Sequence, residues 1–134
     1  MALGGDIIEI TYNHPTLGSG VLFPKSAEDS TYDLGGFRSA DEANGVDGGG
    51  NMIDTINRAR WSFEVLITMD MLVAETLEAI TGMAGSAELA DWTFTNVNGT
   101  VYGGKGKPVG DIQQNGNAST GTLKVSGGGV LSKV

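Results

Sequence analysis

The sequence has no cysteine, one histidine and three prolines among its 134 residues. The absence of cysteine excludes disulfides, thiolate nucleophiles and cysteine-based metal or iron–sulfur sites. A single histidine, His14, leaves little for a transition-metal site or a Ser-His-Asp triad. No apolar run approaches the roughly 18 residues that a membrane-spanning helix needs. We therefore predict no enzyme activity, no catalytic residue, no cofactor, no metal site and no membrane anchor.

Basic residues are also scarce, and they are unevenly placed. Residues 1–98 carry 15 acids and 4 bases, whereas residues 99–134 carry 1 acid and 4 bases, which together give the net charge of -8. An acidic surface repels phosphates, so tight binding of nucleic acid is disfavoured. The asymmetry fits self-association, in which the positive face of one copy meets the negative face of the next, and it fits an ordinary solvated surface equally well.

Glycine is the residue in excess, with 22 copies beside 40% hydrophobic residues. The glycines show no three-residue period, which excludes a collagen-like rod, and the hydrophobic share is too high for a disordered chain. The length fits one domain, residues 1–134. The first residues show neither the basic stretch nor the apolar core of a secretory signal, so we expect folding in the cytosol.

Most hydrophobic residues recur with a period of two, which predicts a mainly β fold. The clearest stripe is Trp61, Phe63, Val65 and Ile67, and this strand is expected at the centre of a sheet. Asn98-Gly99 predicts a tight hairpin. The other predicted strands, with Ile8, Ile10 and Tyr12 on one face of the first, are residues 8–12, 21–23, 92–94, 100–102, 109–113 and 120–125.

One helix is predicted at about residues 70–82. Asp70 can cap its start, Gly82 stands where a helix stops, and the period changes from two to that of a helix in between. Its apolar face would consist of Leu72, Val73, Leu77 and Ile80, and such a face packs against a sheet more often than it binds a partner.

Residues 35–51 fit no regular element and predict a long extended loop with 6 glycines. Loops of this length in a compact domain are usually functional or disordered, so we expect it to be ordered by a partner. Its oxygen-bearing side chains, with Asp54, could also hold calcium, but they lack the spacing of an EF-hand, and a solvated loop is favoured. The candidate contact residues between subunits or rings are Phe37, Arg38, Asp41, Glu42, Asn44, Asp47 and Asn51.

Three further features have competing interpretations. The segment 99–106 resembles a phosphate-binding P-loop, but Gly106 replaces the required hydroxyl residue, and Pro108 prevents the helix that should follow. Trp61 and Trp92 could stack a ligand in a ligand-binding β-sandwich module, although strand tryptophans are more often core. The tail, with Val130, Leu131 and Val134, either closes its own sheet or docks on a neighbour.

The order of these features resembles a known family. The residues that carry the resemblance are the strand Asp6 to Tyr12, the segment 23–36 followed by the glycine-rich loop, the strand 60–64 before the helix, and the runs 90–94 and 98–112. Over nearly its whole length the chain resembles the tail tube proteins of tailed bacteriophages, with the contractile type favoured, and the related inner-tube proteins of other contractile injection machines.

This resemblance implies two packed antiparallel sheets, a β-sandwich or barrel-like fold flanked by one helix. It also implies a structural virion protein that forms hexameric rings with a shared inner β-barrel, stacked into a hollow tube that is assembled in the host cytoplasm. Its partners would be further copies of itself, the tail sheath, the baseplate hub and the tail terminator. DNA would pass without specific binding, since negative charge in the lumen repels phosphates. Glu9 and Glu64 are the candidate lumen acids.

Overall fold

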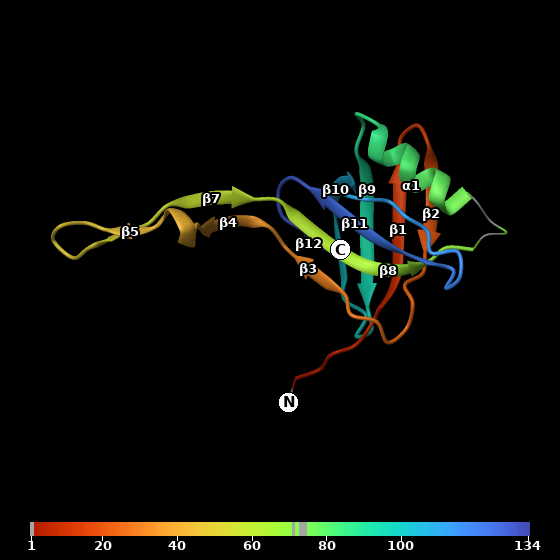
Figure 1. Ribbon diagram of the computed structural model, residues 1–134, viewed down its shortest axis with the longest axis horizontal. Helices are drawn as coiled ribbons and strands as arrows, with labels where there is room; N and C mark the ends of the chain where they lie inside the picture. The colour runs from red at the N-terminus through yellow and green to blue at the C-terminus, as the bar shows by residue number, and fades with distance from the viewer. Residues whose placement is uncertain (1, 71, 73–74) are drawn as a thin grey trace.

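The computed structural model describes residues 2–70, 72 and 75–134. It confirms a mainly β fold with one α-helix in the described part of the chain (Figure 1). The elements are β1 (Ile7–His14), β2 (Gly18–Leu22), β3 (Thr31–Asp33), β4 (Gly36–Ser39), the 3₁₀ helix η1 (Asp41–Ala43), β5 (Gly45–Val46), β6 (Met52–Ile53), β7 (Ile56–Ala59), β8 (Trp61–Thr68), α1 (Glu75–Gly85), β9 (Ala90–Asn96), β10 (Val101–Pro108), β11 (Thr120–Gly127) and β12 (Ser132–Lys133).

The body of the molecule is one antiparallel sheet folded into two halves that face each other. The strand order is β2-β1-β9-β10-β11-β8-β3, and β12 pairs with β10. β10 joins the halves because its residues 101–106 pair with β9 while Lys107 and Pro108 pair with β11. The sheet does not close into a barrel, so β2 and β3 remain at its edges.

The core lies between the two halves. The predicted stripe on β8 is confirmed, since Trp61, Phe63, Val65 and Ile67 are all buried. The Phe63 ring contacts both aromatic side chains of β9, with ring centroids 6.3 Å from Trp92 and 5.0 Å from Phe94. β8 pairs with β11 and β3 but stands next to the edge, so its predicted central position is wrong.

Two strand predictions need correction. A β-bulge between Ile7 and Glu9 turns Ile8 outward, so Ile7 and Ile10 are buried while Ile8 is 48% exposed. Residues 109–113 form no strand, because the chain turns at Gly110, which has φ of 77°, after the ladder ends at Pro108. The strand around 120–125 and the Asn98-Gly99 hairpin between β9 and β10 are confirmed.

Helix α1 covers one open end of the folded sheet (Figure 1). It buries Ile80 and Met83 and half-buries Leu77. The helix continues through Gly82 to Gly85, so the predicted stop is wrong by one turn. At its other end Asp70 Oδ1 accepts the N–H of Leu72 at 2.9 Å, and Leu72 is exposed rather than on the buried face. Residues 71, 73 and 74 of the predicted helix, including Val73, lie outside the described residues.

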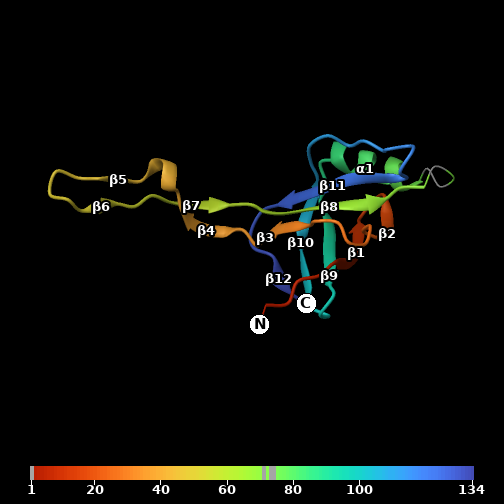
Figure 2. The same ribbon diagram turned by 60° about the horizontal axis from the view of Figure 1, so that its bottom comes forward.

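Residues 34–60 project from the body as a narrow arm (Figures 1 and 2). The ladder β4–β7 forms the arm root, and the shorter ladder β5–β6 forms the arm tip. The stretch 35–51 is therefore the outgoing limb of a two-stranded arm rather than an irregular loop. Sequence periodicity missed it because strands of two to four residues are too short to show alternation, and their partners lie at 52–59, beyond the predicted loop.

Candidate assembly surfaces

The chain passes from the body into the arm at Gly35 and Gly36, and only glycine fits at Gly35. Gly35 and Gly36 have φ of 75° and 96°, in the left-handed region that other residues rarely adopt. A Cβ atom at Gly35 would lie 2.7 Å from the backbone nitrogen of Trp61 and 2.9 Å from the carbonyl oxygen of Gly129. The direction of the arm is therefore set where β3, β8 and the C-terminal segment meet.

An ion pair braces the arm root. Arg38 donates two hydrogen bonds to Asp33, from Nη1 to Oδ2 at 2.9 Å and from Nη2 to Oδ1 at 2.6 Å. The Gly35 N–H also donates to Asp33 Oδ1, at 2.9 Å. The Arg38 hydrogen bonds, followed by the Gly35 N–H, hold the pKa of Asp33 below its usual range. Arg38, predicted as a contact residue between subunits, thus has a partner within its own chain.

A network of side chains joins the two limbs of the arm midway. The Ser39 hydroxyl donates to Asp54 Oδ1, and Asn44 Nδ2 donates to Ser39 Oγ at 2.6 Å. Asn44 Oδ1 accepts the N–H of Thr55 at 2.8 Å, and the Ala40 N–H donates to the Thr55 carbonyl at 2.7 Å. The arm is therefore held by its own hydrogen bonds, and Asn44 contributes to them.

The arm tip turns around Asp47. Its Oδ1 atom accepts the N–H of Asn51 at 3.0 Å and that of Gly49 at 2.8 Å. These backbone hydrogen bonds hold the pKa of Asp47 below its usual range. Asp41 and Glu42 lie apart from this turn, exposed on η1. Over the described residues, no three histidine or acidic side chains are grouped as a metal site requires.

The arm exposes more apolar surface than a solvated loop needs. The Arg58 guanidinium lies over the Phe37 ring, 4.7 Å from its centroid, which is a typical cation–π arrangement. Exposed apolar side chains gathered on a projection are common where proteins contact one another. Its members are each between 51% and 70% exposed: Phe37, Val46, Met52, Ile53 and Ile56.

Several of these contact candidates were missed by the sequence prediction. Met52, Ile53, Ile56 and Arg58 all follow residue 51, on the returning limb of the arm. Their isoleucines and methionine resemble those of an ordinary half-buried strand, and no local pattern separates such a strand from an exposed one. One signal for them was present in the sequence. The segments before and after the glycine-rich stretch are long enough to form the two limbs of a hairpin.

The C-terminal segment packs on its own chain. The Leu131 N–H donates to the Leu34 carbonyl at 2.9 Å, the Val134 N–H donates to the Val101 carbonyl at 2.9 Å, and Leu131 is buried in the core. Of the two predicted alternatives for this tail, the structure shows pairing within its own sheet. Val130 and Val134 remain exposed at 53% and 84%.

The two candidate lumen acids lie on the outer faces of opposite halves of the sheet. Glu9 is on β1, paired with Thr95 of β9, whereas Glu64 is on β8, paired with Lys124 of β11. A tube wall made by one half of the sheet can therefore present only one of these acids to the lumen.

The outer face of the half β2-β1-β9-β10 is covered mainly by short polar side chains, and we call it the hydroxyl face. Alternation along the strands places these side chains opposite buried Ile10, Trp92 and Phe94. The Thr11 and Thr93 hydroxyls are hydrogen-bonded to each other. The charged members of this face are Glu9, Asp91 and Lys105, and its neutral polar members are Thr11, Asn13, Ser19, Thr93 and Thr95. The same register adds two valines, Val21 opposite Thr11 and Val101 opposite Thr95.

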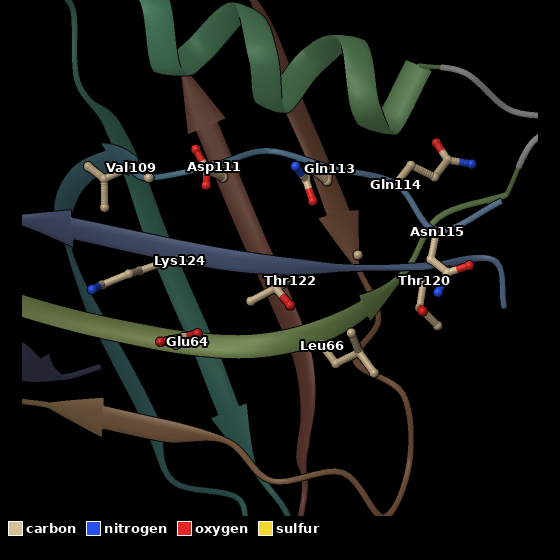
Figure 3. A pocket seen from close by; sticks show the side chains of 12 residues that line it. Glu64, Leu66, Val109, Asp111, Gln113, Gln114, Asn115, Thr120, Thr122 and Lys124 are labelled. Atoms are coloured by element: carbon tan, nitrogen blue, oxygen red, sulfur yellow. The ribbon is translucent and has the colours of Figure 1, made fainter.

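The outer face of β8 and β11 contains an open hollow of about 650 Å³ (Figure 3). Glu64 and Leu66 on β8 and Thr122 and Lys124 on β11 form its floor, and the segment 109–115 forms one side. The lining mixes two acids and one base with amide and hydroxyl groups, and its carboxylates, Glu64 and Asp111, come from separate segments. The hollow has neither a grouped set of ligands nor an apolar floor that would define a small-molecule site.

The remaining chemical candidates have structural explanations. Trp61 and Trp92 are 0% and 1% exposed, so neither offers a ring face to a ligand. Lys105 is exposed on β10, and the chain continues as a strand to Pro108, so the P-loop helix is absent at this site. His14 is buried at the end of β1, where its Nδ1 atom accepts the N–H groups of Thr16 at 3.1 Å and Leu17 at 3.0 Å.

Comparisons with known proteins give no family assignment. No protein-family model matches the chain, and no curated protein sequence matches it significantly. Among the described residues, no helix combines the length and apolar character that a membrane crossing needs. The arm, the hydroxyl face and the two sheet edges are therefore the features from which a function has to be argued.

Proposed function

We propose that this chain is a structural subunit of a bacteriophage tail tube, of the contractile type. Copies of the chain would form hexameric rings, and the rings would stack into a hollow tube that conducts DNA. The protein would act without catalysis and without a cofactor, in the virion after assembly in the host cytoplasm. The sheath, the baseplate hub and the tail terminator are the further partners that this function requires.

The arm is the observation that carries the proposal. Large apolar side chains that are exposed on a projection do not stabilise the monomer, and they favour association with another protein. The side chains concerned are Phe37, Val46, Met52, Ile53 and Ile56. The arm is internally hydrogen-bonded before it meets a partner, so its docking costs less conformational entropy than the docking of a disordered loop. These properties support a protein whose function is assembly.

The sheet edges support closure of a ring. β2 (Gly18–Leu22) is an edge strand whose sequence contains neither a charge nor a proline, the residues with which monomeric proteins protect such edges. Pairing of β2 with a strand of the next copy would remove this edge, as it does in any closed barrel.

The hydroxyl face supports the passage of DNA. It carries two acids, Glu9 and Asp91, and one base, Lys105, among neutral hydroxyl and amide groups. Such a surface offers few cations to phosphates, and phosphate neutralisation by cations supplies most non-specific DNA affinity. We therefore place this face, with Glu9, toward the lumen, and the face of Glu64 toward the outside of the tube.

Electron microscopy of the purified protein tests the proposal. Rings or tubes of uniform diameter with a central hole are expected at high concentration, or after addition of a baseplate nucleus. A protein that stays monomeric under all these conditions contradicts the proposal. An inner-tube protein of a non-phage injection machine would form similar tubes, and packaging of the tubes into virions with DNA distinguishes the two.

A further inference from the structure

Charged residues are arranged differently at the arm root and at the α1 end of the molecule. All three arginines of the chain, Arg38, Arg58 and Arg60, lie at the arm root, and the root strands β4 and β7 contain no acid, although residues 34–60 contain four acids in the segments between these strands. In contrast, residues 61–98 contain six acids and no lysine or arginine. Near the start of α1, Glu75 and Glu78 are exposed, and Leu72, which precedes the helix in the sequence, is 93% exposed.

Strand β8 keeps these two ends apart. Arg58 and Arg60 precede its first residue, Trp61, and Asp70 follows shortly after its last residue, Thr68. Eight residues of strand span about 26 Å at about 3.3 Å per residue. Figures 1 and 2 show the arm and the first turn of α1 at opposite ends of the long axis. The arginines at the arm root therefore cannot reach Glu75 and Glu78 of the same chain.

The arginines at the arm root differ in how they are engaged. Arg38 is bound by Asp33, but in the described part of the chain no carboxylate forms an ion pair with Arg58 or Arg60. Asp41 and Glu42 both line the same hollow of about 540 Å³ as Arg58, and neither forms an ion pair with it. The Arg58 guanidinium instead rests on the exposed Phe37 ring. Arginine is one of the residues enriched at interface hot spots.

We propose that the arm root of one copy docks on the α1 end of the next copy, with Arg58 facing Glu75 and Glu78 and with Phe37 covering Leu72. The inference rests on the proposed function and specifies a contact through which the copies would assemble. It is a head-to-tail contact between different surfaces, and contacts of this kind generate rings or open stacks rather than closed pairs. The matching of an arginine–aromatic patch with an acidic–apolar patch selects the partner and its orientation.

Charge reversal and its rescue test the contact. Arg58→Glu should raise the concentration needed for half-maximal assembly, measured by sedimentation velocity, by roughly thirtyfold, which is the loss expected at a hot spot. Glu78→Arg should impair assembly as well, but acids in the first turn also stabilise the helix. The decisive variant is therefore R58E/E78R, which restores an opposite-charge pair between copies and should recover at least about a tenth of the wild-type assembly strength.

Matched controls change the same charges elsewhere. Lys25→Glu and Asp111→Arg alter exposed residues that belong to neither of the two proposed surfaces, and both variants should assemble like the wild type. Assembly by Arg58→Glu at wild-type concentrations overturns the inference, and so does a double variant no better than Arg58→Glu alone. If either of these results is found and the wild-type protein forms tubes, the inference is wrong and the proposed function stands. A wild-type protein that never assembles contradicts the proposed function itself.

Discussion

The arm and the body of this protein are stabilised by different forces. The described part of the chain has sixteen buried hydrophobic residues in its core, and none of them lies in residues 34–60. The body is held by burial of aromatic and aliphatic side chains between two half-sheets, whereas the arm is held by short ladders, the Asp33–Arg38 pair and the Ser39–Asn44–Asp54 network. Many apolar residues in the body are buried in the core, and large apolar residues in the arm are exposed.

The largest effect that separates the two regions is expected from truncation of a core aromatic. Trp61→Ala should destabilise the body by about 3–5 kcal/mol, because it removes a fully buried ring that stacks on Phe63. Phe37→Ala removes an exposed ring and should change the free energy of unfolding by less than about 0.5 kcal/mol. Urea denaturation followed by circular dichroism measures both. Similar values for the two variants would mean that arm and body do not differ in this way.

Removal of the arm should abolish assembly without unfolding the body. Phe37 and Arg58 are paired in the β4–β7 ladder, so residues 38–57 can be replaced by an Asn-Gly turn that closes a hairpin between them. We expect an unchanged melting transition, because the body keeps its whole core. We expect no rings or tubes, because the deletion removes Val46, Met52, Ile53 and Ile56. A melting temperature lowered by more than a few degrees would show that the arm supports the body. Normal tubes would show that the shortened root suffices.

The smallest expected effect is a loosening of the arm at acid pH. Asp33 and Asp47 have pKa values below the usual range, so the stability that they contribute is present above the unfolded pKa and is lost as the pH falls through their folded values. Both groups are exposed, and their contribution is correspondingly small.

NMR titration of amide protons measures this loosening directly. Below about pH 4, the amides that these carboxylates bind, those of Gly35, Gly49 and Asn51, should shift while core amides of β8 and β11 stay unchanged. Asp33→Asn should remove the transition at Gly35 and leave that at Gly49. A transition shared by arm and core amides would contradict the separation of the two regions.

Sequence reasoning succeeded where a local pattern and tertiary packing agree. Trp61 to Ile67 alternate because one face of β8 is buried, and Asn98-Gly99 forms the predicted hairpin since Gly99 adopts φ of 89°. The predicted Ile8 stripe failed because a bulge shifts the register by one residue, and no local pattern encodes that shift.

The candidate site was predicted only in part. Phe37 and the acids Asp41, Glu42 and Asp47 are exposed on the arm, as the choice of contact residues requires. Arg38 and Asn44 turned out to bind within their own chain, because the residues that they contact, Asp33 and Thr55, lie outside the predicted loop. Pairing between distant residues depends on the register of two limbs, and a single sequence does not reveal that register.

The continuity of β7 and β8 has a mechanical consequence. The two strands are separated by one residue and run in roughly the same direction (Figures 1 and 2). A pull on the arm along this line would load the β8–β11 ladder in shear, with eight residue pairs, from Gly127 with Trp61 to Thr120 with Thr68, resisting together. Ladders loaded in shear yield at higher force than ladders peeled one pair at a time, so the returning limb of the arm continues into a ladder that resists tension along its length.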